Sequence, residues 1–144
     1  MVIRTPAINP GFQIPRRGYI EFNTSSIPDG ATITDVDLNI SINSVPFGGG
    51  PRANITQIEK QVASQTNANL YADIGNGTAY LNNTLLNTVQ WYNLDLGINA
   101  DTDLQNLLSN NWFAVGFRGI DEDSTHANET WVDASESTSD PELV

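Results

Sequence analysis

Cysteine is absent from this chain of 144 residues, which excludes disulfide bridges, thiolate metal sites and a cysteine nucleophile. The one histidine, His126, lies in a polar stretch, and there is no Gly-x-Ser-x-Gly motif, so no serine hydrolase triad can be recognised. A carboxylate pair for glycoside hydrolysis would form only by tertiary contact, and that alternative stays open. We therefore expect a protein that is not an enzyme.

Long apolar runs and basic residues are also scarce. No stretch of about 18 apolar residues occurs, so we expect no insertion into a membrane. Six Lys and Arg stand against 17 Asp and Glu, a net charge of -11, and so few bases cannot replace the counterions around phosphates, which excludes nucleic acid as a partner. Polarity comes instead from Asn, Thr, Ser and Gly, a composition that suits strands and turns and favours an extracellular or cell-surface location.

Short stretches of alternating apolar and polar residues predict strands. The clearest is 32–43, in which Val36, Leu38, Ile40 and Ile42 alternate with polar residues. Such a strand buries one face and exposes the other to solvent.

Helical spacing is rarer than strand spacing. Residues 101–109 predict one short helix, with Asp101 as its N-cap, whereas a turn at 73–78 between apolar pairs predicts a small hairpin over 70–81. Many short strands and one short helix predict an all-β fold, an antiparallel β-sandwich of the jelly-roll type.

Prolines separate the beginning of the chain from the rest. Pro6, Pro10 and Pro15 each remove a backbone donor and favour extended geometry in the preceding residue, so residues 1–15 are predicted to form an extended N-terminal arm. We expect residues 16–144 to form a single jelly-roll domain.

One stretch resembles a known family. The residues 17–33, RGYIEFNTSSIPDGATI, precede an alternating strand and resemble the opening of DNRLRE-type domains, also called disaggregatase-related domains. The helix before Trp112, and the run 131–136 that leads to 141–143, are also similar to that family. The resemblance implies a jelly roll similar to carbohydrate-binding modules, found in large secreted or cell-surface proteins of bacteria and archaea, and it transfers no catalytic residue.

The chain departs from that family at both ends. Such domains usually open with a strand before the 17–33 motif and close with a long apolar strand, whereas this chain has a Pro-rich arm and ends at Val144. A sandwich short of a strand leaves a sheet edge open, which is costly unless a neighbouring subunit covers it or the chain is one module of a longer protein.

These departures favour self-assembly as the function. We expect a non-enzymatic extracellular structural subunit that joins copies of itself head to tail by strand exchange, in a pilus-like filament or a surface layer. The inserted apolar positions would be Val2, Ile3, Ala7 and Ile8, with the end at Val144 as the alternative donor. The alternative function is a carbohydrate-binding or adhesion module, in which Tyr71 and Tyr80, flanking the predicted turn, stack on a polysaccharide.

Acidic residues suggest calcium as a stabilising ion, because calcium takes six to eight oxygen ligands. Eight of the acids and no Lys or Arg lie between residues 121 and 144. The candidate ligands are Asp121, Glu122, Asp123, Asp101, Asp103 and Asp73. The alternatives are a charged solvated loop at 121–123 and a helix cap at Asp101.

Six Asn-x-Ser/Thr sequons predict N-glycosylation of the surface. They lie at Asn23, Asn39, Asn54, Asn76, Asn82 and Asn128. The alternative is that a chain rich in Asn and Thr contains such triplets by chance.

Overall fold

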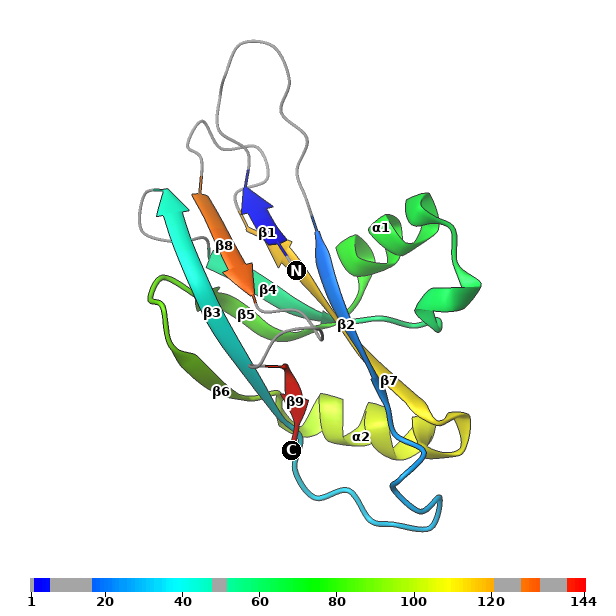
Figure 1. Ribbon diagram of the computed structural model, residues 1–144. Helices are drawn as coiled ribbons and strands as arrows, with labels where there is room; N and C mark the ends of the chain where they lie inside the picture. The colour runs from blue at the N-terminus through cyan, green and yellow to red at the C-terminus, as the bar shows by residue number, and fades with distance from the viewer. Residues whose placement is uncertain (1, 6–16, 48–51, 121–127, 133–139) are drawn as a thin grey trace.

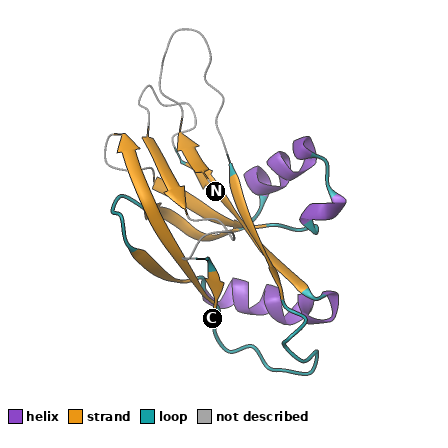
Figure 2. Cartoon of the chain, in the orientation of Figure 1, coloured by secondary structure: helices purple, strands orange, loops and turns teal. Residues whose placement is uncertain are grey.

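Strands in two sheets make up most of the described structure. The computed structural model describes residues 2–5, 17–47, 52–120, 128–132 and 140–144. Its strands are β1 (Val2–Thr5), β2 (Gly18–Asn23), β3 (Asp37–Phe47), β4 (Arg52–Gln57), β5 (Ala79–Leu85), β6 (Trp91–Asp95), β7 (Trp112–Gly119), β8 (Asn128–Val132) and β9 (Glu142–Leu143). Its helices are α1 (Asn67–Asn76) and α2 (Gly97–Leu107), with short 3-10 turns at η1 (Val62–Ser64) and η2 (Leu108–Asn110). Figure 2 shows both α-helices lying beside the strands.

The strands pair as in a jelly roll (Figure 1). One sheet has the order β1-β8-β3-β6, with β9 also pairing with β3, and the other has the order β2-β7-β4-β5. In these sheets β1 pairs with β8, β2 with β7, β3 with β6 and β4 with β5, each antiparallel, so the first four strands meet the next four in reverse order. This nested pairing over two sheets confirms the predicted β-sandwich and defines its jelly-roll topology.

The hydrophobic core lies between the sheets. The predicted alternation in β3 holds, because Leu38, Ile40 and Ile42 are fully or almost fully buried, as is Val36 just before the strand. Apolar side chains from the other sheet and from α2 complete the same core. Burial of this apolar area is the main stabilising contribution to the sandwich.

Strand β7 is buried on both of its faces. Phe113, Val115 and Phe117 belong to the core between the sheets, whereas Trp112 and Ala114 belong to a second apolar cluster with residues of α1. A strand covered on both sides has a nearly continuous apolar sequence, as β7 does.

Helix α1 approaches β7 closely at Gly116. A Cβ atom at this position would lie 2.8 Å from Ile74 Cγ2 and 2.8 Å from Thr56 Oγ1, so only glycine allows the helix to pack here. The Thr56 hydroxyl donates a hydrogen bond to the carbonyl oxygen of Ile74 at 3.0 Å. These contacts hold α1 against the outer face of the second sheet.

The hairpin predicted over 70–81 is wrong, because the first half of this range belongs to helix α1. Thr66 is its N-cap, with a side-chain oxygen that accepts a hydrogen bond from the backbone N–H of Asn69 at 3.3 Å. Leu70 and Ile74, one turn apart, are the buried residues of the helix, and this packing favours a helix over a turn. The other predicted helix, at 101–109, is present as α2 and η2 and begins four residues earlier than expected.

The beginning of the chain is a strand of the sandwich. In β1, Val2 lies opposite Trp131 and Ile3 opposite Thr130 of β8 in the same chain. The chain therefore has a strand where we expected only an arm, and the remainder of that arm, residues 6–15, lies outside the described residues. Near the other end, β9 pairs with β3 through Leu143 opposite Leu38.

A partly buried hydrogen bond joins α2 to β5. The hydroxyl of Tyr80 in β5 donates to Asp103 Oδ2 in α2 at 2.8 Å, and the Tyr80 ring stacks on Phe113 with centroids 6.1 Å apart. Burial raises the pKa of Tyr80 far above the ordinary value of 10.0, and it is the largest cause of the shift. The hydrogen bond to Asp103 and the negative charge of Asp103 raise this pKa further.

This raised pKa predicts a loss of stability in alkali. Above pH 10.0, Tyr80 ionises in the unfolded chain while the folded chain keeps its proton, so the free energy of unfolding should fall by about 1.4 kcal/mol per pH unit from this group. Tyr80→Phe should remove that slope and, below pH 10.0, cost about 1 kcal/mol for the lost hydrogen bond. Urea unfolding at several pH values measures both effects. The exposed Tyr19→Phe is the control, and an equal change of slope in both variants would contradict the assignment.

Candidate functional site

The outer face of β3 and β6 carries a narrow band of polar residues and one tryptophan. The pairing of the two strands places Asp37 opposite Asp95, Asn39 opposite Asn93 and Ser41 opposite Trp91. Because neighbours along a strand point to opposite faces, and Leu38, Ile40, Tyr92 and Leu94 pack on the core, these six side chains lie on the outer face. We call this set the outer strip: Asp37, Asn39, Ser41, Trp91, Asn93 and Asp95.

Hydrogen bonds order the middle of the outer strip. The side-chain amide nitrogen of Asn93 donates to Asn39 Oδ1 at 2.7 Å and approaches Asp37 Oδ2 at 3.4 Å. On the other side of β3, Glu142 of β9 lies opposite Asn39. The result is a row of polar side chains across three strands.

Trp91 supplies the apolar part of the outer strip. Its side chain is 50% exposed although it lies in a strand, and Val89, just before the strand, is 61% exposed. Tryptophan is a large apolar ring with one hydrogen-bond donor, so an exposed tryptophan among amides and carboxylates can bind a partner that is partly apolar and partly polar.

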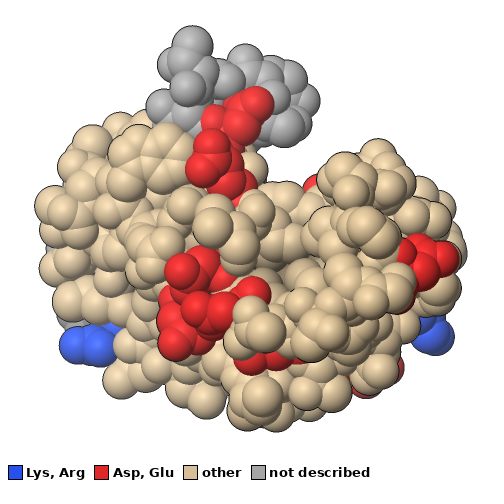
Figure 3. Space-filling model, turned by 90° about the horizontal axis from the view of Figure 1, so that it is seen from below, with Lys and Arg blue, Asp and Glu red and all other residues tan. Residues whose placement is uncertain are grey.

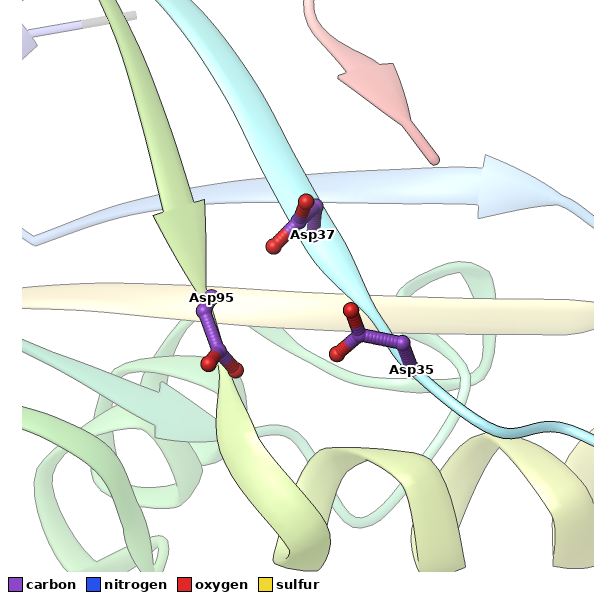
Figure 4. Close-up of side chains that lie close together, drawn as sticks. All are labelled: Asp35, Asp37 and Asp95. Atoms are coloured by element: carbon purple, nitrogen blue, oxygen red, sulfur yellow. The ribbon is translucent and has the colours of Figure 1, made fainter.

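Three carboxylates gather at one end of the outer strip. One ligand oxygen each of Asp35, Asp37 and Asp95 lies within 4.8 Å of the others, and Figure 4 shows the three side chains pointing toward one another beside the start of α2. Asp35 and Asp95 are exposed, and Asp37 is half-buried. This carboxylate cluster could bind a metal ion.

Local backbone contacts bring the three carboxylates together. Asp37 is the first residue of β3 and Asp95 is the last residue of β6, so antiparallel pairing places them side by side. The N–H of Leu96 donates to the carbonyl oxygen of Val36 at 3.0 Å, which extends the contact past both strand ends. Asp95 Oδ1 also accepts from the N–H of Gly97 at 2.7 Å, at a backbone φ of 75° that favours glycine.

The charge around the cluster is negative. Figure 3, which views this end of the sandwich, shows acidic atoms gathered in the middle of the face and basic atoms only at its margins. A divalent cation that prefers carboxylate oxygen would reduce the repulsion between the three side chains.

The acids that we predicted as metal ligands have other positions. Asp73 Oδ1 accepts from the N–H of Glu59 at 3.2 Å and Asp73 Oδ2 from Gln65 Nε2 at 2.9 Å, so this side chain joins a loop to α1. Asp103 accepts from Tyr80, and Asp101 is 8% exposed with an Oδ1 that has no hydrogen-bond partner.

Among the described residues, the one group of three acids does not include these predicted ligands. Asp121, Glu122 and Asp123 lie outside the described residues. The sequence signal for the observed cluster is an Asp-x-Asp pair at the start of a strand, which we interpreted as an ordinary solvent-exposed face, and its third member depends on a pairing 58 residues away.

The aromatic candidates also differ from the expectation. Tyr80 is half-buried between Phe113 and α2, so its ring is not an open platform. Tyr71 is exposed, but the guanidinium of Arg17 lies 3.9 Å from its ring centroid and covers one face. Trp91, by contrast, is exposed and shares a face with the hydrogen-bonded side chains of Asn39 and Asn93.

The remaining predicted positions are distributed over the surface and the sheets. Asn23, Asn76 and Asn82 are exposed. Asn76 was predicted to lie in a turn, but it is the last residue of α1. Asn39 and Asn54 are half-buried, and their side-chain oxygens accept from Asn93 Nδ2 and from the N–H of Asn83.

The other predicted positions lie in paired strands or outside the described residues. Asn128 lies in β8, and Val2 and Ile3 lie in β1. Ala7 and Ile8 lie outside the described residues.

Comparison with known proteins finds no protein-family model that matches the chain and no curated protein that matches its sequence. The resemblance of residues 17–33 to DNRLRE-type domains therefore stays a prediction. Among the described helices, none has both the length and the apolar character needed to cross a membrane.

Proposed function

We propose that this chain is a non-enzymatic carbohydrate-binding or adhesion module of an extracellular or cell-surface protein, and that the outer strip binds the polysaccharide. The observation that carries the proposal is Trp91, half-exposed on an edge strand beside the hydrogen-bonded pair of Asn39 and Asn93. An indole ring stacks on the apolar face of a pyranose, while amide groups donate to and accept from its hydroxyl groups.

The position of the outer strip suits a binding module. Trp91, Asn93 and Asp95 are exposed, and Asp37 and Asn39 are half-buried, so a ligand can reach these side chains without any change in the sandwich. Ser41 is buried and lies outside the reach of a ligand. The strip is also a sheet surface and not a loop, so the relative positions of ring and amides are set by strand pairing. Binding then costs little conformational ordering of the protein.

Replacement of the tryptophan tests the proposal. Trp91→Ala should weaken binding to an insoluble polysaccharide by at least about tenfold, because the stacking surface is lost, while the free energy of unfolding changes little. Pull-down with a panel of insoluble polysaccharides, followed by titration with the soluble form of the one that binds, measures the change. Tyr19→Ala removes an aromatic side chain of similar exposure from the other sheet and should bind as the unchanged chain does. Equal losses in both variants would contradict a role for the outer strip.

We also propose that the carboxylate cluster binds calcium and stabilises the end of the sandwich. Three carboxylates can supply three or more of the six to eight oxygens that calcium takes, with water or ligand oxygens as the others. The ion would link the start of β3 to the end of β6.

Calcium binding should appear as a shift in the melting temperature. At a concentration 100 times the dissociation constant, calcium should add about 2.7 kcal/mol to the free energy of unfolding, a rise in Tm of roughly 8 °C. Asp37→Asn should abolish most of this rise, and Asp73→Asn, outside the cluster, should retain it. Differential scanning calorimetry with calcium and with EDTA measures the rise, and an identical Tm in both buffers would refute the proposed site.

Self-assembly by strand exchange is the second candidate function. It is favoured by β1, which lies at the edge of its sheet and is held there by a four-residue ladder to β8. The same ladder can form between β1 of one copy and β8 of the next, which would join copies head to tail.

Deletion of the first residues tests this second candidate. If copies assemble by exchange of β1, the chain should form filaments in negative-stain microscopy, and a chain without residues 1–15 should remain as single copies in sedimentation velocity. A chain without residues 142–144 serves as the control for loss of a terminal strand. Filaments that persist without residues 1–15 would show that β1 is not the exchanged strand.

A further inference from the structure

We propose that the outer strip selects an extended, uncharged glycan and binds several consecutive sugar units lengthwise along β6, an inference that rests on the proposed carbohydrate-binding function. The ligand class follows from two properties of the outer strip, which are its length and the sign of its charge.

The length of the outer strip exceeds one sugar ring. Trp91, Asn93 and Asp95 are alternate residues of one strand and share one face, so the first and the last are separated by roughly 13 Å at about 3.3 Å per residue. The partners on β3 form a second row parallel to the first. A linear chain of sugars that stacks on Trp91 would therefore continue over Asn93 and Asn39 toward Asp95.

The two rows differ from one end to the other, so they favour one orientation of the bound ligand. The stacking group lies at one end, the amides lie in the middle and the carboxylates lie at the other end. Every group after Trp91 recognises hydroxyl or amide groups by hydrogen bonds and has no apolar platform of its own. One ring is held by stacking, and its neighbours are held by their hydroxyl groups.

The charge of the outer strip excludes anionic glycans. Asp37 and Asp95 lie on the strip, Asp35 is within 4.8 Å of both, and Glu142 lies opposite Asn39. Charges at such separations interact within the Debye length of about 8 Å at physiological ionic strength. A uronate or sulfate group bound beside Asn93 would be repelled by all four.

The basic side chains that the structure describes lie away from the outer strip. Lys60 lines a pocket with residues of α1. Arg17 and Arg118 donate to the carbonyl oxygens of Tyr71 and Gly75 in α1, and Arg52 of β4 donates to that of Asn83 in β5. The hydrogen bonds of all three arginines therefore lie on the sheet that contains β2 and β7, or on the helix packed against it. A calcium ion in the carboxylate cluster would neutralise two of the four negative charges, so the remaining charge still disfavours an anion.

Several series of oligosaccharides of defined length test the inference. Isothermal titration calorimetry would use neutral cello-, manno- and chito-oligosaccharides of one to six units and oligogalacturonates of the same lengths, each in EDTA and in calcium. We expect at least one neutral series to gain affinity from one unit to three, and every oligogalacturonate to bind far more weakly than that series in either buffer. A monosaccharide that binds as tightly as its hexamer, or an oligogalacturonate that binds as tightly as the neutral chain, would overturn the inference.

A charge variant separates the selectivity from the binding itself. In EDTA, Asp37→Asn should improve oligogalacturonate binding about fivefold relative to the neutral oligomer, because one of the four repelling charges is gone. Asp29→Asn, which removes an exposed acid from the turn after β2, should leave this ratio unchanged. An equal ratio in both variants would contradict selection by charge.

The outcomes also distinguish the inference from the proposed function. If a branched or anionic polysaccharide binds in a way that depends on Trp91, the module binds carbohydrate and the inferred ligand class is wrong. If no saccharide binds and Trp91→Ala changes nothing, both the proposed function and the inference fail.

Discussion

The antiparallel pairing of β3 with β6 determines both the core and the candidate site. In the observed register Leu38 and Ile40 face the core, and Asp37, Asn39 and Ser41 face outward beside Asp95, Asn93 and Trp91. A slip of one residue would turn the apolar side chains to solvent and the acids into the core, so the burial of the apolar face also holds the polar face in place. The outer strip therefore needs no stabilising contacts of its own beyond the Asn39–Asn93 hydrogen bond.

The same pairing explains why negative charge gathers at one end of the sandwich. Antiparallel neighbours place the start of one strand beside the end of the other, and acids occupy both positions here. The segment before β3 is held along α2, because Gln105 accepts from the N–H of Ile33 and donates to the carbonyl oxygen of Ala31. These contacts position Asp35 next to Asp37 and Asp95, so an ion bound there would act on the junction of β3, β6 and α2.

Local patterns predicted the elements of this fold better than they predicted its site. The alternation around Leu38 and Ile40 identified a strand with one buried face, and the frequency of such strands indicated the sandwich. The helix α1 was missed because its signal, Thr66 followed by Leu70 and Ile74, is short and depends on packing against β7. The three-carboxylate cluster could not be predicted, because no local pattern specifies which strand pairs with β3 or in which register.

Coverage of the sheets by helices explains why the candidate site lies on β3 and β6 and not on the other sheet. The outer face of β7 is buried by Leu70 and Ile74 of α1, and Gly116 allows the helix to lie close against it. Helix α2 contributes Ala100 and Leu104 to the core, and η2 contributes Leu108. In the described residues, the outer face of β3 and β6 has no helix packed against it (Figure 1). The half-exposed tryptophan on this face is not part of the core clusters, and under the proposed function it is the surface on which the ligand stacks.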